Sequence, residues 1–214
     1  MSAPAEPPRD CKRCDRLVSF RAENRAAHAD WFNAPVPSFG TDDARLLIVG
    51  LAPGLQGANR TGRPFTGDFA GDLLYATLSK FGFAKGVYGG RPDDGFELID
   101  CMVTNAVRCV PPQNKPIGAE IANCRSFLEA RLGSMPRLEV TLALGRIAHD
   151  SVLAAFGLRK AAYPFGHGHR HDAVGRFVLF DSYHCSRYNT NTRRLTAEMF
   201  ESVFEEIRRE LDPN

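Results

Sequence analysis

A short apolar segment that runs directly into a glycine-rich polar loop limits the folds open to this chain more than any other feature. Arg45–Leu51 is nearly continuous in apolar residues, which is typical of a strand covered on both faces. The loop Gly50–Asp68 follows, and from Gly71 to Phe81 apolar residues recur at helical spacing. A strand, a polar loop and a helix in this order indicate a parallel α/β sheet, in which ligands bind beyond the carboxyl ends of the strands.

The rest of the chain repeats this alternation of strands and helices. Further strands are predicted at 96–107, 140–144 and 177–182, and further helices at 17–30, 118–132, 146–156 and 196–211. Such alternation predicts an α/β fold with three α/β/α layers around a central four-stranded parallel sheet. The 214 residues, 43% of them hydrophobic, suit one domain spanning residues 1–214, in which the proline-rich residues 1–10 are expected to be flexible.

Composition excludes some classes of protein. The 27 Lys and Arg residues nearly balance the 25 Asp and Glu residues, so the net charge of +2 is weak evidence about partners. No apolar run is long enough to span a bilayer, and residues 1–10 lack the apolar core of a signal peptide. The phosphate-binding loop of ATPases is absent as well. We therefore expect a soluble, cytoplasmic protein that does not hydrolyse ATP.

Four of the six cysteines lie in two loop-rich regions. Cys11 and Cys14 form a Cys-x2-Cys pair, and Cys109 and Cys124 lie in a second region. Clustered thiols of a cytoplasmic protein are more often metal ligands than disulfides, and four thiolates suit zinc or an iron–sulfur cluster. The wide second spacing does not resemble a compact zinc ribbon, and four unrelated buried thiols remain the alternative. The other two cysteines are interpreted as free thiols.

Polar groups follow each of the four predicted strands. They lie in the loop Gly50–Asp68, in residues 104–116, at Gly145–Arg146 and at Tyr183–Arg187. Because the carboxyl ends of parallel strands meet at one edge of the sheet, these loops are expected to converge on one active site.

Two side chains at this edge suit catalysis, although each has a simpler explanation. The carboxylate of Asp68 can position or deprotonate water and stabilise a developing cation, or it can cap the helix that follows. The imidazole of His184 can hydrogen-bond a departing anion, or it can be a core histidine whose hydrogen bonds are satisfied. Local sequence leaves both questions open.

Other groups at this edge suit a nucleic acid. Phe65 could stack on a heterocycle, or it could pack its loop onto the sheet. A positive rim with Tyr188 interleaved fits a phosphate backbone, with ordinary solvated charge as the alternative. The members of this rim are Arg60, Arg63, Lys115, Arg187, Arg193 and Arg194. The alternate histidines of His167–His171 lie in a glycine-rich connection, which favours a solvent-exposed turn over a metal site.

In their order along the chain, these motifs resemble the family 5 uracil-DNA glycosylases, the type b enzymes of bacteria and archaea. The resemblance covers nearly the whole chain and rests on Cys11–Cys14, Gly50–Asp68, Asn105–Pro116, Cys124, Ala143–Ala148 and Ser182–Thr192. It implies a structural four-iron four-sulfur cluster held by Cys11, Cys14, Cys109 and Cys124. It also implies a monofunctional enzyme that flips uracil out of DNA and hydrolyses its glycosidic bond, leaving an abasic site for base excision repair.

The resemblance further implies roles for single residues. Asp68 would stabilise the cationic sugar and position water, while His184 would stabilise the leaving oxygen. Phe65 would stack on the flipped base. Asn105 and Asn114 would hydrogen-bond the edge of the base. The backbone at Gly50, Leu51 and Ala52 would contact its carbonyl oxygens. Family 4 relatives carry an acidic residue where this chain has Leu51, which shifts the catalytic burden to Asp68.

The partner implied is DNA that contains uracil or other deaminated bases such as hypoxanthine, bound by a monomer in the nucleoid of a prokaryote. DNA contacts are expected from Arg60, Arg63 and Lys115, and from Ser186, Arg187 and Tyr188 in the minor groove. Many relatives carry proline or another small apolar residue where this chain has Cys185, whose thiol we expect to pack rather than react. A DNA-binding protein without turnover and a redox sensor are the competing functions.

Overall fold

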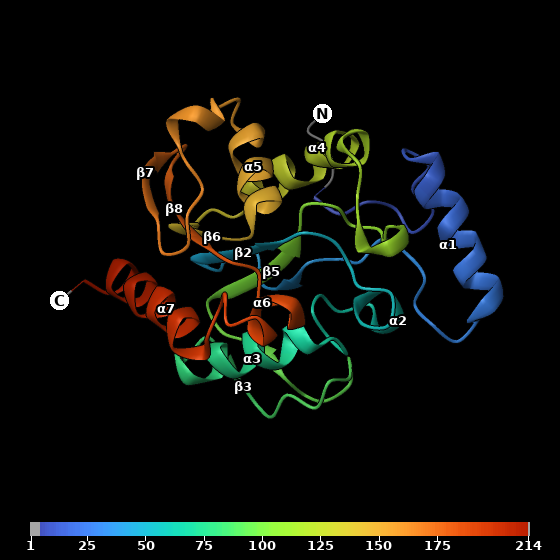
Figure 1. Cartoon of the computed structure of the whole chain (residues 1–214), viewed down its shortest axis with the longest axis horizontal. Helices are drawn as coiled ribbons and strands as arrows, with labels where there is room; N and C mark the ends of the chain where they lie inside the picture. Colours follow the sequence, from blue (N-terminus) through green and yellow to red (C-terminus); the bar gives the residue numbers. More distant parts are fainter. Residues whose placement is uncertain (1–4, 214) are drawn as a thin grey trace.

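A six-stranded sheet runs through the centre of the molecule, with helices on both of its faces (Figure 1). The computed structural model describes residues 5–213. The strands follow the order β1-β5-β2-β6-β8-β7 across the sheet. Their bounds are Phe39–Gly40 (β1), Leu46–Gly50 (β2), Cys101–Asn105 (β5), Val140–Leu144 (β6), Arg170–Val174 (β7) and Phe177–Ser182 (β8). A separate ribbon pairs β3, Ala84–Lys85, with β4, Glu97–Leu98.

The four predicted parallel strands form the centre of this sheet. β5, β2, β6 and β8 are neighbours and run parallel, so that Gly50 pairs with Asn105 at their carboxyl ends. The predicted α/β class is confirmed, but the strand number was incomplete because β1 and β7 add antiparallel edges. Two-residue β1 is too short to show a pattern. β7 carries polar residues at an edge, so it lacks the apolar run of a buried strand.

Within residues 5–213, five long helices lie close to the predicted positions, and the loops contain several short ones. The long helices are α1 (Asp15–Ala27), α3 (Phe69–Lys80), α4 (Gly118–Ser134), α5 (Arg146–Ala155) and α7 (Ala197–Leu211). The short ones are α2 (Ala58–Thr61), α6 (Arg187–Asn191) and the 3-10 turns η1 (Pro112–Asn114) and η2 (Lys160–Ala162). A helix of four or five residues is too short to produce a helical period, which explains why α2 and α6 were expected to be loops.

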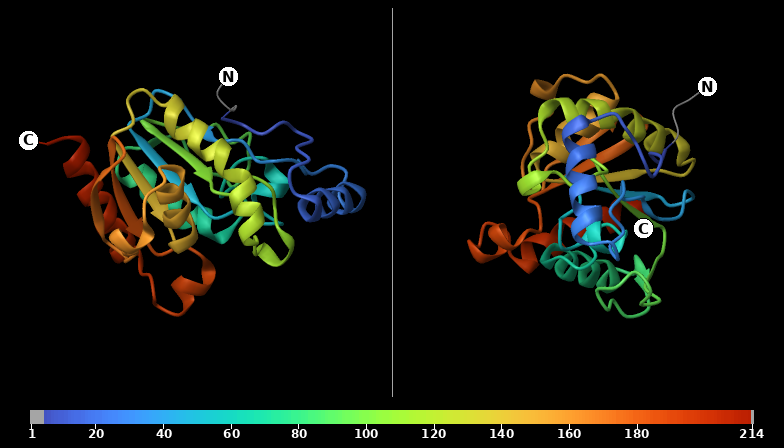
Figure 2. Two further views of the ribbon diagram at one scale, coloured as in Figure 1. Left: turned by 90° about the horizontal axis from the view of Figure 1, so that it is seen from above. Right: turned by 90° about the vertical axis from the view of Figure 1, so that its right-hand side faces the viewer.

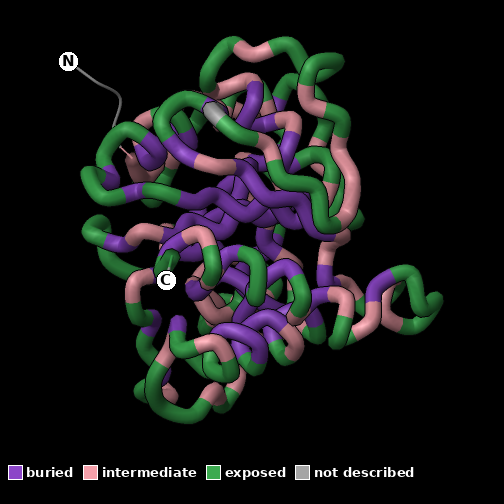
Figure 3. The backbone as a smooth tube through the Cα atoms, turned by 90° about the vertical axis from the view of Figure 1, so that its left-hand side faces the viewer, coloured by how far each residue is buried: buried purple, intermediate pink, exposed green. Residues whose placement is uncertain are grey.

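The central strands send alternate side chains into two cores. Leu46 and Ile48 pack with α3 and α7, whereas Leu47 and Val49 pack with α4 and α5. Every residue of β2 is buried as a result, which explains its continuous apolar run. The buried backbone is concentrated in the sheet in Figure 3, while Figure 2 shows α1 at one end of the molecule, away from these layers.

Part of the segment expected to be flexible makes defined contacts. Residues 1–4 lie outside the described residues, but Glu6 forms ion pairs with Arg108 and Arg131. The side chain of Arg108 is only 1% exposed, so the carboxylate of Glu6 compensates a buried positive charge. No helix within residues 5–213 is both long enough and apolar enough to cross a bilayer.

Candidate active site

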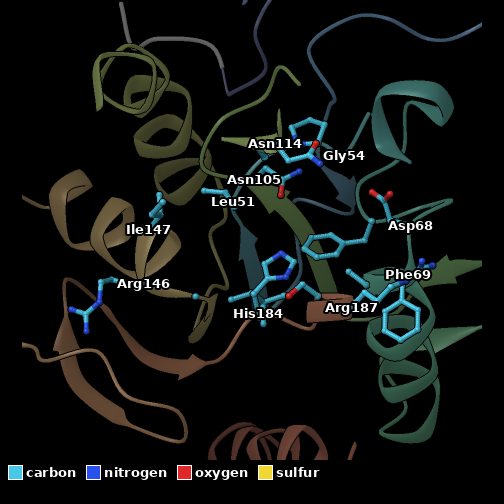
Figure 4. Close-up of a pocket in the computed structure, with 17 residues that line it drawn as sticks. Leu51, Gly54, Asp68, Phe69, Asn105, Asn114, Arg146, Ile147, His184 and Arg187 are labelled. Carbon is cyan, nitrogen blue, oxygen red and sulfur yellow. The ribbon is translucent and has the colours of Figure 1, made fainter. Parts of the chain in front are cut away.

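A cavity of about 700 Å³ opens where the central strands end (Figure 4). Its walls come from the loop after β2, the end of β5, the turn between β6 and α5, and the segment after β8, so the four predicted polar loops do converge. The lining residues that the sequence predicted are Leu51, Ala52, Phe65, Asp68, Asn105, Asn114, His184, Ser186 and Arg187.

The carboxylate of Asp68 lines this cavity and does not cap the helix that follows it, α3. Asp68 occupies the N-cap position of α3, yet its side chain accepts no hydrogen bond there. It accepts the backbone N–H of Ala58 instead and lies against Gly54 and Gly57, where any Cβ would overlap its oxygens. Burial raises the pKa of Asp68, and the Ala58 N–H and the charge of Arg60 oppose that rise only in part. The two glycines therefore leave room for the carboxylate, and its raised pKa makes it a better proton acceptor.

Asn105 offers an unused acceptor to the cavity. The residue is only 3% exposed, and its Oδ1 atom is buried without a hydrogen-bond partner among residues 5–213. A Cβ on Gly50 would overlap both this oxygen and the ring of Phe65, so Gly50 contributes by its small size and does not itself line the cavity. A buried acceptor without a protein donor is costly, so this oxygen is available to an N–H of a ligand that enters the cavity.

Phe65 and His184 form an aromatic wall. Their rings are stacked with centroids 5.7 Å apart, and Phe65 is held at a φ of 56°, a left-handed conformation that costs a residue with a side chain roughly 1–3 kcal/mol. Burial lowers the pKa of His184 to about 4, so its imidazole is neutral at neutral pH. The Nδ1 atom of His184 is buried and has no hydrogen-bond partner in the part of the chain that the structure describes, so this ring is not a satisfied core histidine.

Of the candidate cations, Arg63 was assigned wrongly to the DNA-binding surface. Its guanidinium is 6% exposed and forms a paired ion bridge to Asp94 with N–O distances of 2.8 Å. It also donates to Thr66 at 2.7 Å, so it fixes the loop from within. Arg60 and Lys115 are exposed, and Lys115 lies beside the cavity without lining it.

The segment after β8 presents exposed groups at the mouth of the cavity. Ser186 caps α6 by accepting the backbone N–H of Asn189, which turns Arg187 and Tyr188 outward. Arg187 stacks over Phe69 at 5.2 Å from the ring centroid, and Tyr188 is 72% exposed. Large exposed rings and unpaired guanidinium groups are suited to contact with a ligand surface.

Sequence reasoning gave no individual role to several lining residues, although it placed Arg146 among the converging polar groups. Phe69, Arg146 and Ile147 line the cavity, and Phe69 and Ile147 are each 38% exposed. Only their positions in the sequence could have indicated that they line the cavity, since Phe69 follows Asp68 directly and Arg146–Ile147 follow the end of β6.

The four candidate metal ligands Cys11, Cys14, Cys109 and Cys124 line one small cavity beside α1 and α4. None of them forms a disulfide. N–H groups point at three of the sulfurs: the Arg108 backbone at Cys124 (3.4 Å), Arg21 at Cys109 (3.6 Å) and Asn123 at Cys14 (3.5 Å). Burial raises the pKa of Cys109 to about 12, so a bound cation is needed to keep this sulfur ionised at neutral pH.

The other two cysteines are packing residues. Cys101 and Cys185 are both fully buried. The thiol of Cys185 donates to the carbonyl of Ala70 at 3.4 Å, and burial raises its pKa to about 12, so it lacks the thiolate character that a reactive cysteine needs.

A second polar cluster joins His149 of α5, His171 of β7 and Asp181 of β8. Their ligand atoms lie within 4.8 Å of one another, so the three could surround a metal ion. Hydrogen bonds already satisfy them, however: Asp181 contacts His149 at 2.7 Å and His171 at 3.0 Å, and His149 donates to the Tyr163 carbonyl at 2.8 Å. His171 therefore belongs to a buried ionic network. The expectation that His167–His171 is entirely a solvent-exposed turn is wrong for this residue.

The network predicts a pH-dependent contribution to stability. Burial alone would lower the pKa of His149, but the carboxylate of Asp181 and the Tyr163 carbonyl outweigh it, so the pKa is raised. A raised folded-state pKa stabilises fully below the unfolded value of about 6.5 and loses its effect as the pH rises through the folded value. His149→Gln should therefore lower the melting temperature more at pH 6 than at pH 9. An equal loss at both pH values would show that His149 is neutral in the folded protein.

Comparisons with known proteins identify relatives along most of the chain. A sequence model of the uracil DNA glycosylase superfamily matches residues 37–208. A type-5 uracil-DNA glycosylase of Thermus thermophilus is 47% identical over 204 residues, which cover 93% of this chain and 93% of the relative. A type-5 uracil-DNA glycosylase of Pyrobaculum aerophilum is 40% identical over 91% of this chain and 86% of its own length. A type-4 uracil-DNA glycosylase of Sulfurisphaera tokodaii is 30% identical over 91% and 79%.

Proposed function

Because the chain belongs to the uracil-DNA glycosylase superfamily, we propose that it hydrolyses the N-glycosidic bond of deoxyuridine in DNA and leaves an abasic site. The relatives described above carry this activity in their names. The observation that carries the proposal is the pair of buried, unpartnered atoms in the cavity, Asn105 Oδ1 and His184 Nδ1.

Recognition of uracil follows from these unpartnered atoms. The base displays an N–H between two carbonyl oxygens, and in a duplex that edge is paired, so the nucleotide must first leave the stack. In the cavity, Asn105 Oδ1 would accept the N–H, Phe65 would stack on the ring, and the backbone at Leu51 and Ala52 would meet a carbonyl oxygen. Hypoxanthine displays the same N–H beside one carbonyl, so we include it among the substrates.

Bond cleavage divides between two side chains. As the glycosidic bond breaks, its electron pair leaves with the base while the sugar becomes cationic. Neutral His184 would hydrogen-bond the oxygen that gains this negative charge, and the carboxylate of Asp68 would stabilise the sugar and take a proton from the attacking water. No lysine lines the cavity, so a Schiff-base step that nicks the strand is not expected.

For binding, we propose that the exposed groups Arg60, Lys115 and Arg187 contact phosphates and that Tyr188 enters the minor groove beside Ser186. Asn114, which lies in the segment between Cys109 and Cys124, would close one side of the pocket. We further propose a monomer of one domain that works on chromosomal DNA in the prokaryotic nucleoid.

We also propose a structural four-iron four-sulfur cluster on Cys11, Cys14, Cys109 and Cys124. Their shared cavity and the N–H groups aimed at the sulfurs suit thiolate ligands. Among the described residues these four sulfurs do not form a group whose ligand atoms all lie within 4.8 Å of one another, so the proposal rests on their shared cavity and on the N–H groups aimed at them. The cluster would stabilise the fold and take no part in the reaction.

Incubation with matched duplexes tests the proposed activity. The duplexes contain U, hypoxanthine or only normal bases, and strand breaks are measured with and without alkali. Breaks at U that require alkali would establish a monofunctional glycosylase, and the hypoxanthine lane would measure its breadth. No break in any lane, with DNA binding retained, would refute hydrolysis and favour a binding protein.

The pH dependence of base release tests the assigned protonation states. The mechanism needs ionised Asp68 and neutral His184, whose pKa is about 4. Both groups are in the wrong state at low pH, so the single-turnover rate should fall as the pH drops through the raised pKa of Asp68 and on toward the His184 value of about 4. A rate that rises as the pH falls from 7 to 5 would show instead that an imidazolium ion assists departure of the base.

A further inference from the structure

The segment that carries Phe65 is held by hydrogen bonds on both sides of this residue, whose φ is 56°. The carbonyl of Pro64 accepts the hydroxyl of Tyr75, and the carbonyl of Phe65 accepts the hydroxyl of Tyr88 at 3.4 Å. The oxygen of Tyr88 also accepts the backbone N–H of Gly67 at 3.3 Å. Because a left-handed residue with a side chain persists only where its surroundings fix it, these contacts decide where the Phe65 ring lies.

The side chain of Arg63 fixes the same segment from within the protein. Its Nε atom donates to the hydroxyl of Thr66 at 2.7 Å, so the side chain connects the residues on either side of Phe65. Three aromatic rings surround the guanidinium, which lies 5.0 Å, 5.8 Å and 5.6 Å from the centroids of Phe39, Tyr75 and Tyr88. A charge enclosed in this way has little access to water, so a protein group must compensate it.

The carboxylate of Asp94 compensates this charge. Its side chain is 4% exposed, and each of its oxygens lies 2.8 Å from a guanidinium nitrogen of Arg63. It also accepts the backbone N–H groups of Gly89 at 2.9 Å and Phe96 at 3.0 Å, so the segment between β3 and β4 fixes its position. The hydrogen bonds from Arg63 hold the pKa of Asp94 well below its ordinary value, which keeps the pair ionised at neutral pH. Asp94 does not line the cavity, so it can affect the reaction only through Arg63 and its loop.

We propose that Asp94 is a positioning residue for the reaction, because through Arg63 it holds Phe65 where the flipped base stacks. The proposal rests on the proposed function, since it requires a base in the cavity. The Phe65 ring is stacked with that of His184 at 5.7 Å between centroids, and Asp68 follows three residues later in the chain. A shift of this segment would therefore move the stacking surface and the catalytic carboxylate together, and a displacement of about 1 Å can reduce a rate by about 10²-fold.

Asp94→Asn keeps the shape of the side chain but leaves the buried charge of Arg63 uncompensated. Single-turnover release of uracil by the whole protein should fall by about 10- to 100-fold. One control, Asp93→Asn, changes the exposed neighbouring carboxylate and should leave the rate and the melting temperature unchanged. A second control, Asp100→Asn, weakens the ion pair with Arg45 before the amino end of β5, away from the cavity. It should lower the melting temperature and keep the rate.

Binding measurements separate positioning from a purely structural role. Two duplexes that resist hydrolysis are compared, one with 2′-fluoroarabinouridine, which presents a base to Phe65, and one with a tetrahydrofuran abasic site, which presents none. Asp94→Asn should weaken binding of the first duplex by about tenfold, because a base–aromatic stack is disturbed, and leave binding of the second unchanged. Equal weakening on both duplexes would show that Asp94 only stabilises the fold and would overturn the proposal.

A double-mutant cycle provides an independent test. If Asp94 acts through Phe65, Asp94→Asn should slow uracil release much less in a Phe65→Ala background than in the wild type. Tyr88→Phe removes the hydroxyl that contacts the Phe65 carbonyl and leaves the ion pair intact, so it gives the same comparison if Asp94→Asn does not accumulate as folded protein. Additive losses in both cycles would overturn the positioning role. No uracil release by the wild type would instead refute the proposed function.

Discussion

Replacing Asp68 by Asn is expected to slow uracil release by about 10²- to 10⁴-fold, the usual contribution of a positioned general base. Asparagine has the same shape, and its oxygen can still accept the Ala58 N–H, so the cavity should keep its form. The amide cannot accept the proton of the attacking water, and it carries no charge to stabilise the cationic sugar. Single-turnover kinetics on a U-containing duplex measure the rate, and fluorescence anisotropy measures binding, which should stay near the wild-type value.

Stability should separate this loss from misfolding. Because burial raises the pKa of Asp68, the ionised form costs the folded state free energy at neutral pH, and that cost disappears as the pH falls through the folded-state pKa. Asp68→Asn should therefore melt no lower than the wild type at pH 7. The control Asp72→Asn removes an exposed carboxylate from the first turn of α3 and should keep the rate within about twofold. Unchanged uracil release by Asp68→Asn would remove this residue from the mechanism.

The sequence predicted the convergence of the site because that convergence depends on strand order alone. Once β2 and β5 are taken as parallel neighbours, Asn105 must end beside Gly50. The sequence pattern could not decide the role of Asp68, because a residue directly before a helix can be either a helix cap or a catalytic carboxylate. The difference lies in Gly54 and Gly57, where the lack of a Cβ leaves room for the carboxylate.

Contacts between distant residues explain what the sequence could not predict. Arg63 was assigned to DNA because it follows Arg60 in a polar loop, but Asp94, which buries it in an ion pair, lies 31 residues away. His171 was expected on a turn because it lies in a glycine-rich connection, but its partner Asp181 lies across the antiparallel pair of β7 and β8. An arginine or a charged histidine is buried only if a partner elsewhere in the fold compensates its charge. The local sequence does not show whether such a partner exists.

The second large effect is expected from removal of one proposed cluster ligand. Cys109→Ser should lose the bound iron and the brown colour, since a serine hydroxyl is a poor substitute for a thiolate. A structural metal contributes several kcal/mol to folding, so the melting temperature should fall by on the order of 10 °C or more. Uracil release should fall as well, because the segment between Cys109 and Cys124 contains Asn114, which lines the pocket.

Cys185→Ser is the matched control for this experiment. Cys185 is also buried, but it lies outside the cysteine cavity, and a serine can keep the hydrogen bond to the Ala70 carbonyl. Iron analysis should therefore give the wild-type content for Cys185→Ser and a large loss for Cys109→Ser. If Cys109→Ser does not accumulate as folded protein, oxidative removal of iron from the wild type in the presence of a chelator gives the same comparison by calorimetry. Iron retained by Cys109→Ser, or a wild type that contains none, would refute the cluster. The four thiols would then be packing residues, as Cys101 and Cys185 are.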